Sequence, residues 1–264
     1  NTNMSGALSI MSVSNTRPQF TLTGTLIFSG NSAQTYQVGH HKVTAIVKNL
    51  EITNASSRLY STGSGVSLSG SLTVTLGTMD LTRVAQAQPL IVEGGISVAN
   101  SASASFMTVN NMTVSGSVTL GASSLFSMTG GTLTFNADNP QTVTINGSDR
   151  RFNNMVLNNA GGTLTQNQVT FAGQPFSLSG TLTVTLGNMD LTTNSIGLQS
   201  RGTILVANSA LAKLTSAGGL TTSGNVIVKP SGTLTMTDNT LVLDGVLQSL
   251  SGSMTLNNLT KDVN

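Results

Sequence analysis

The chain of 264 residues lacks cysteine and tryptophan, and only 8% of its residues are charged. Without cysteine there is no disulfide framework, so the fold must depend on a core large enough to need none. No apolar run approaches the ~18 residues that a membrane-spanning helix needs, so no such helix is expected. The sequence begins at Asn1 without a charged segment followed by an apolar one. We therefore expect that any signal peptide has already been removed.

The scarcity of charge argues against several classes of partner. Eleven Lys and Arg residues against nine Asp and Glu residues give a net charge of +2. The basic residues are spread over the whole length instead of forming a stripe, so binding to nucleic acid is not expected. The one adjacent basic pair, Arg150–Arg151, is interpreted as a solvated turn. Strong helix formers are few, and the abundant Thr, Val, Gly, Asn and Ser predict many short strands and tight turns.

Two long segments of the chain are nearly identical. Residues 67–82 read SLSGSLTVTLGTMDLT and residues 177–192 read SLSGTLTVTLGNMDLT, differing only at positions 71/181 and 78/188. Shorter matches on both sides, such as VANSA at 98–102 and 206–210, define a repeat of about 108 residues. The copies occupy roughly residues 20–127 and 128–235, with partial copies at both ends. Because no linker divides them, we predict one continuous domain over residues 1–264.

Apolar residues alternate with threonines inside the repeat. In the run LTVTL at 72–76 the period of two places the apolar residues on one face and the threonines on the other. Turn signals recur about every 8–12 residues, which is typical of an all-β fold. A solenoid lengthens by adding copies, whereas a sandwich has a fixed number of strands. We therefore predict a parallel β-solenoid with coils of roughly 20–25 residues, with tandem β-sandwiches as the alternative.

The motifs in residues 130–198 also support a resemblance to known proteins. They are FNNMVLNN at 152–159 and GTLTVTLGNMDL at 180–191. The first copy retains the second motif but departs from the first, with VKNLEI at 47–52. The chain resembles repetitive secreted bacterial surface proteins with β-helix repeats, of the adhesin or autotransporter type. The resemblance implies a secreted or outer-surface stalk, adhesin or fibre component, and it implies neither an enzyme nor any binding residue.

Asp80 and Asp190 are the only ionisable residues at matched places of the two copies. They could be calcium ligands or one carboxylate of a glycosidase pair. Calcium requires several converging oxygens, and glycoside hydrolysis requires two carboxylates about 5–10 Å apart. Each copy supplies a single carboxylate at this place. We therefore interpret both aspartates as turn residues that hydrogen bond with the nearby backbone.

The other residues that could carry chemistry have simpler explanations. His40 and His41 are adjacent, so on a strand they point to opposite faces, and a surface turn is favoured over a metal site. No nucleophile elbow, phosphate loop or dinucleotide fingerprint occurs. Thr-x-Thr pairs could order water, as on some ice-binding proteins. Because they recur irregularly, we interpret them as part of an ordinary solvent-exposed face. The pairs are Thr21/Thr23, Thr73/Thr75 and Thr183/Thr185. The methionines in leucine-like positions are expected to fill the core; they are Met79, Met189 and Met236.

The sequence thus predicts no catalytic, cofactor-binding or metal-binding residue and no cofactor. Our first hypothesis is a structural extracellular protein, a subunit of a filament or surface layer that associates with copies of itself head to tail or edge to edge. The alternative is an adhesin stalk that binds glycans or a host surface. A third hypothesis is a polysaccharide-active enzyme, because a β-helix can host one. It ranks last because the nine carboxylates are scattered over the chain.

Overall fold

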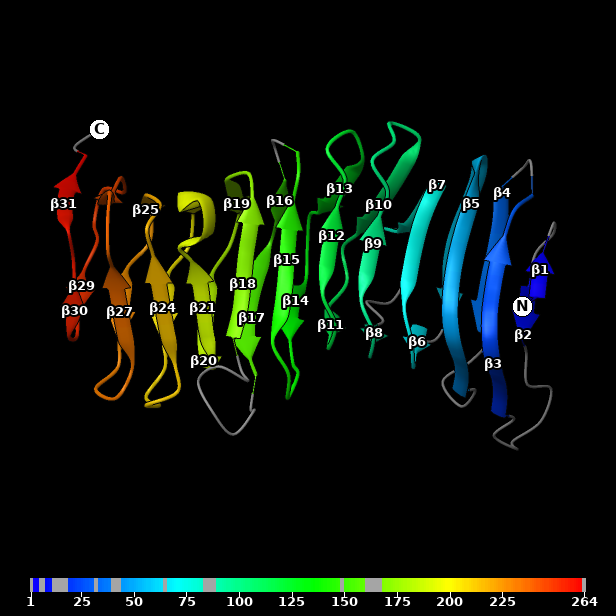
Figure 1. Ribbon diagram of the computed structural model, residues 1–264, viewed down its shortest axis with the longest axis horizontal. Helices are drawn as coiled ribbons and strands as arrows, with labels where there is room; N and C mark the ends of the chain where they lie inside the picture. The colour runs from blue at the N-terminus through cyan, green and yellow to red at the C-terminus, as the bar shows by residue number, and fades with distance from the viewer. Residues whose placement is uncertain are drawn as a thin grey trace. The chain divides into compact units, whose positions relative to one another are not determined.

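A computed structural model describes residues 2–4, 8–10, 19–30, 33–38, 44–63, 66–82, 89–147, 150–159 and 168–262. The described residues form 31 strands and one short 3₁₀ helix (Figure 1). The chain divides into two compact units, Asn1–Gly131 and Thr132–Asn264. The boundary lies close to the junction of the two sequence copies. The single continuous domain over residues 1–264 stays a prediction.

The first unit is built of parallel strands that recur at fixed intervals along the chain. The later strands pair with the third strand that follows, as β8 does with β11, β9 with β12 and β10 with β13. The long strand β5 pairs with both β6 and β7, and the long strand β7 pairs with both β9 and β10. The strands of this unit are β1 (Thr2–Met4), β2 (Leu8–Ile10), β3 (Gln19–Phe28), β4 (Ala33–Val38), β5 (Thr44–Gly63), β6 (Val66–Leu68), β7 (Leu72–Leu81), β8 (Leu90–Val92), β9 (Ile96–Val98), β10 (Ala104–Thr108), β11 (Met112–Val114), β12 (Val118–Leu120) and β13 (Leu125–Met128).

The second unit has three strands in each coil, so its stack has three faces. Face A holds β14 (Thr132–Phe135), β17 (Asn154–Asn158), β20 (Leu182–Leu186), β23 (Ile204–Val206), β26 (Val226–Val228) and β29 (Leu250–Ser251). Face B holds β15 (Gln141–Ile145), β18 (Gln168–Gly173), β21 (Asn188–Leu191), β24 (Lys213–Ser216), β27 (Thr233–Met236) and β30 (Met254–Thr255). Face C holds β16 (Arg151–Phe152), β19 (Phe176–Leu178), β22 (Leu198–Ser200), β25 (Leu220–Thr222), β28 (Thr240–Leu243) and β31 (Asn258–Lys261), and the 3₁₀ helix η1 (Thr193–Ser195) precedes β22.

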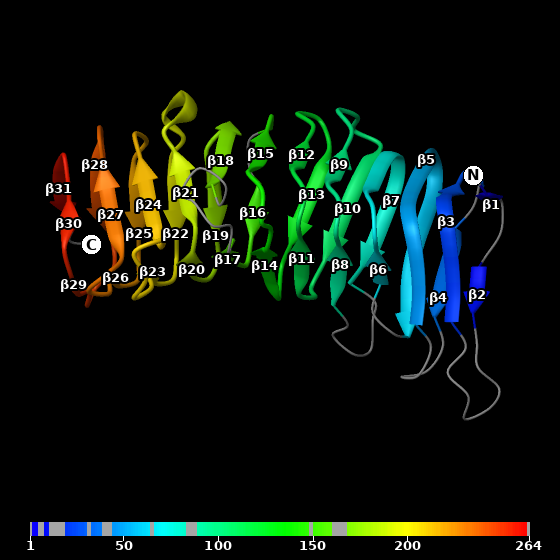
Figure 2. The ribbon, with the colours of Figure 1, turned by 60° about the horizontal axis from the view of Figure 1, so that its bottom comes forward.

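The chain returns to the same face after one coil. Figure 2 shows the strands of one coil, for example β26, β27 and β28, following one another around the stack. Matched residues on face A, such as Leu182, Ile204 and Val226, follow at intervals of 22 residues. The predicted parallel β-solenoid is therefore confirmed, and its coil length falls within the expected range. The alternative of tandem β-sandwiches is wrong, because sandwich sheets are antiparallel and these strands pair in parallel.

The alternation read from the sequence places one face of each strand inside the coil. In the first unit Leu72 and Val74 are fully buried, and the threonine between them is half-buried. Met79, Met189 and Met236 are buried, so their predicted core positions are confirmed. Each inward residue stacks on its counterpart in the next coil, which produces apolar columns parallel to the stack axis.

Candidate functional site

The two matched aspartates lie at strand ends and bond with the backbone two residues on. The Thr82 backbone N–H and hydroxyl donate to Asp80 Oδ1 at 3.0 and 2.6 Å, and the Thr192 N–H donates to Asp190 Oδ1 at 2.8 Å. The turn geometry predicted from the sequence is confirmed at both places. The Gln168 side chain also donates to Asp190 Oδ2, at 2.6 Å. Within the described ranges, no group of three or more His, Asp or Glu side chains is arranged to hold a metal ion.

Arg150 and Arg151 do not share one environment. Arg151 begins β16 and is exposed, whereas Arg150 directly before it is only 4% exposed. The predicted solvated turn is therefore wrong for Arg150, because the alternation at the start of β16 turns neighbouring side chains in opposite directions. Burial lowers the pKa of the Arg150 guanidinium from its ordinary value, since desolvation disfavours the charged form. His40 and His41 lie outside the described residues.

Polar side chains that are scattered along the sequence come together in one row on face B. The register of five successive strand pairs stacks them one per coil. The row consists of Thr142, Thr170, Asp190, Thr215, Thr235 and Thr255. The sequence intervals between these residues are unequal because the turns differ in length, so no periodic signal reveals the row. Asp190 interrupts the threonines, as expected of an ordinary solvent-facing surface.

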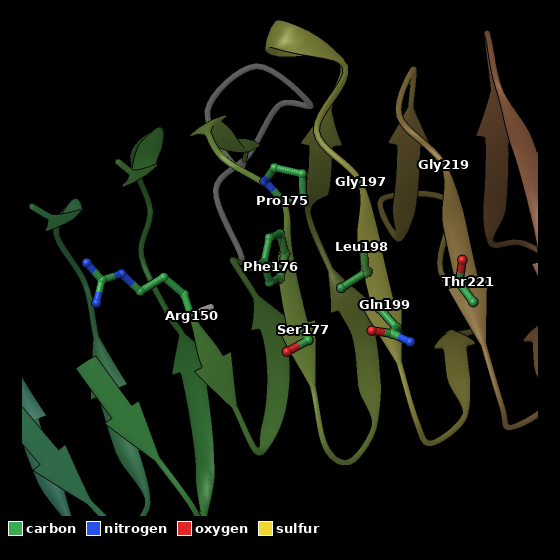
Figure 3. A pocket seen from close by; sticks show the side chains of 9 residues that line it. All are labelled: Arg150, Pro175, Phe176, Ser177, Gly197, Leu198, Gln199, Gly219 and Thr221. Atoms are coloured by element: carbon green, nitrogen blue, oxygen red, sulfur yellow. The ribbon is translucent and has the colours of Figure 1, made fainter. Parts of the chain in front are cut away.

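Face C of the second unit carries a hollow of about 360 Å³. It extends over the three successive strands β19, β22 and β25, and Figure 3 shows its lining. The outward side chains Ser177, Gln199 and Thr221 stand opposite one another in register, one per coil. Successive coils are about 4.8 Å apart, so these three groups span roughly 10 Å along the stack. They offer hydroxyl and amide groups that both donate and accept hydrogen bonds.

A second row runs beside these side chains and contains glycine. Because Phe176, Leu198 and Leu220 pair in register, the residues directly before them, Pro175, Gly197 and Gly219, stack as well. The two glycines leave the floor of the hollow without side chains, and the exposed Pro175 borders it.

Of the lining residues that the structure describes, Arg150 is the charged one, and none is a carboxylate. In Figure 3 the Arg150 side chain runs away from Phe176, so its guanidinium does not point over the glycine floor. The arrangement provides uncharged hydrogen-bonding groups beside an open floor. It does not bring together the paired carboxylates that glycoside hydrolysis requires.

Apart from Arg150, none of the residues that line this hollow stands out in the sequence. The signal that could have found it is the pair of glycines before leucines at 197–198 and 219–220, separated by the coil length of roughly 22 residues. That spacing has meaning only when the coil length is known.

No helix among the described residues is long and apolar enough to cross a membrane. Comparison of the chain with protein-family models, with curated proteins and with solved structures finds no match. Any assignment of function therefore depends on the residues and geometry of this chain.

Proposed function

We propose that this protein is a structural subunit, placed outside the cell or on its surface, that associates with copies of itself coil on coil. The observation that carries the proposal is the parallel ladder of the second unit, to which a further coil of the same kind can be added at strands β29 to β31. These strands continue the apolar columns of the coils before them, with Leu250 and Leu259 exposed and Met254 half-buried. The resemblance of the sequence to secreted bacterial surface proteins supports the proposed location.

The exposed apolar residues align with buried ones. Leu250 pairs with Val226 on face A, and Leu259 pairs with Leu241 on face C. Val226 and Leu241 are fully buried, whereas Leu250 is 37% and Leu259 is 51% exposed. One further coil laid on this surface would bury them as their neighbours are buried. Burial of apolar area contributes roughly 25 cal/mol per Å², so such a contact is favourable.

The loop between β28 and β29 carries two further exposed apolar side chains. Val246 and Leu247 at its tip are 86% and 92% exposed. The Gln248 side chain holds the loop against the preceding coil, because its Nε2 donates to the Thr222 carbonyl at 2.6 Å and to the Gly224 carbonyl at 2.8 Å. Two large apolar side chains on a tethered loop are characteristic of a contact surface.

A coil of a second copy, built on the same parallel ladder, fits this edge. Strands β29 to β31 present backbone groups on their outer edge, and such edges template another strand. In the first unit β1 pairs in parallel with β3, and β2 pairs in parallel with β4. Head-to-tail contact would continue the same parallel ladder, and because it does not close it generates a filament.

A charged residue on the edge tests this proposal. In the double variant Leu250→Lys and Leu259→Lys, stacking a coil would bury two ammonium groups, which is strongly unfavourable. Sedimentation velocity and negative-stain electron microscopy over a range of concentrations should show rods that lengthen with concentration for the unchanged chain and discrete monomers for the variant. Thr119→Lys, an exposed outward position on β12, is the matched control and should form rods.

Two results would overturn the proposal. One is an unchanged chain that stays monomeric at every concentration. The other is a double variant that forms rods as readily as the Thr119→Lys control, since the edge would then play no part. Circular dichroism of each variant, with a β spectrum like that of the unchanged chain, establishes that the comparison is between folded proteins.

A further inference from the structure

Gly197 and Gly219 differ from the glycines at the other turns of the second unit, because neither backbone conformation nor packing requires them. A Cβ atom at Gly197 would meet its nearest neighbour, the Gly219 carbonyl oxygen, at 3.5 Å, and one at Gly219 would meet the Thr240 carbonyl oxygen at 3.8 Å. Both are ordinary van der Waals distances, and neither residue has a positive φ. By contrast, a Cβ at Gly202 would lie 2.7 Å from the Gly180 backbone.

Glycine that the fold does not need is unfavourable, since it loses more conformational freedom on folding than any other residue. Within β-structure such a glycine often marks a place where a ligand or another backbone approaches closely. Here two of them lie in register and form the floor of the 360 Å³ hollow on face C. Side chains at these two positions would fill the space above the floor. The hollow is therefore kept open by residue choice.

The groups around the floor indicate the chemistry of an occupant. The backbone groups of these strands already take part in the ladder; for example, the Leu198 N–H donates to the Gly219 carbonyl at 2.9 Å. An extended peptide would thus find no backbone edge to pair with, because the hollow lies on a face of the sheet. Recognition depends instead on the hydroxyl and amide groups of Ser177, Gln199 and Thr221, which suit a polyhydroxylated chain.

The charged residues near the hollow favour an acidic polyhydroxylated chain over a neutral one. The exposed Arg151 stands in register with Ser177, at one end of the row of hydroxyl and amide groups. Among the described residues, the lining contains no carboxylate that would repel an anion. A guanidinium binds carboxylate or sulfate groups in a two-pronged geometry. The exposed ring of Pro175 and the bare glycine floor provide apolar surface for the C–H groups of a sugar.

We propose that the hollow on face C of the second unit binds an extended acidic polysaccharide. Its chain lies along the stack axis over Gly197 and Gly219. Its hydroxyl groups bond with Ser177, Gln199 and Thr221, and an anionic group reaches Arg151. This site is separate from the coil edge of the proposed assembly, so either can exist without the other.

Calorimetric titration with three sets of oligosaccharides tests the site: alginate for carboxylate, dextran sulfate for sulfate, and neutral dextran. The unchanged chain should bind at least one acidic set more tightly than dextran. The double variant Gly197→Val and Gly219→Val fills the floor and should weaken binding at least tenfold. Gln199→Ala, which leaves the backbone unaltered, should weaken it severalfold, and Arg151→Gln should reduce only the preference for acidic over neutral chains. Thr235→Val on face B is the matched control and should bind as the unchanged chain does.

Each alternative result contradicts the proposal in a different way. If no oligosaccharide binds at millimolar concentration, the hollow has no such ligand. If acidic chains bind equally to the glycine variant, to Gln199→Ala and to the control, the binding is non-specific attraction to positive charge. If polyglutamate binds as tightly as alginate and depends on the same residues, the occupant is an anionic peptide. The Gln199→Ala result remains interpretable even if the glycine variant fails to fold.

Discussion

Asn49 and Asn154 occupy matched positions in the two repeat copies and perform the same task. The Ser71 N–H donates to Asn49 Oδ1 at 2.8 Å, and the Thr181 N–H donates to Asn154 Oδ1 at 2.8 Å. Each asparagine thereby satisfies a backbone donor of the Ser-Gly turn in the following coil. The contact ties turns that are more than twenty residues apart in sequence, so it fixes how one coil sits on the next.

We expect Asn154→Ala to reduce the free energy of unfolding by about 1 kcal/mol, because the Thr181 N–H loses its partner in the turn. Urea unfolding followed by circular dichroism measures the change. The exposed Thr119→Ala serves as a control and should shift stability by less than about 0.5 kcal/mol. Equal effects of the two substitutions would contradict the role assigned to the asparagine.

Gly173 represents the opposite case from Gly197. Its φ is +103°, a region that residues with a side chain rarely adopt, and a Cβ there would collide with the Ile145 carbonyl. Gly173→Ala should therefore destabilise the protein by about 1–3 kcal/mol or more, whereas Gly197→Ala should be neutral or slightly stabilising. The melting temperatures of the two variants, each compared with that of the unchanged chain, test this difference. A similar loss in both variants would mean that the position of Gly197 is also constrained by the fold.

At the scale of strands, aromatic rings join neighbouring coils inside the second unit. Phe171 of β18 stacks on Phe176 of β19, with ring centroids 4.9 Å apart. It also meets Phe135 of β14 edge-on at 6.1 Å, and Phe176 meets Phe152 at 5.8 Å. Phe171 thus links strands of three different faces. In the first unit, Phe106 and Phe126 form one stacked pair at 5.4 Å.

Removal of the central ring should therefore be costly. We expect Phe171→Ala to lower the free energy of unfolding by about 3–5 kcal/mol, because it leaves a cavity bordered by rigid strands. Phe171→Leu keeps most of the volume and should cost less than about 1.5 kcal/mol. Leu205→Ala, a half-buried outward position on β23, provides the comparison for an apolar residue outside the core. Chemical denaturation curves of the three variants would contradict this account if Phe171→Ala and Leu205→Ala were equally stable.

At the scale of the whole molecule, the scarcity of charge determines how assembly should respond to the solvent. Charged residues make up 8% of the chain, and the edge assigned to self-association is apolar at Leu250 and Leu259. Salt screens interactions between charges but does not weaken apolar contacts. Assembly driven by this edge is therefore insensitive to moderate salt.

Rods of the unchanged chain should persist when sodium chloride is raised from 0.05 to about 1 M, where the screening length falls to about 3 Å. Sodium sulfate, which strengthens apolar association, should lengthen them. Light scattering and electron microscopy of the same samples give the measurement. Dissociation at high salt would show that ion pairs between copies, and not the apolar columns, hold the assembly together.

The sequence by itself determined the strands and their inward faces, because alternation and turn residues act over a few neighbouring positions. Leu72, Val74 and Met79 are buried as predicted, and Asp80 and Asp190 bond with the backbone of their own turns. The coil length also followed, since the repeat had to be divided into strands separated by regular turns. These features depend on interactions between residues that are close in sequence, and each copy of the repeat contains those residues.

The register between coils was decided only by the tertiary structure. Turns and loops of unequal length determine which residues stand opposite one another on neighbouring strands. The pairing register cannot be derived from these lengths alone, because it also depends on how each coil lies on the next. The alignment of Ser177, Gln199 and Thr221, the stacking of Gly197 on Gly219 and the hollow above them all depend on that register. The candidate site could not be predicted from the sequence, because its residues become neighbours only when one coil lies on the next.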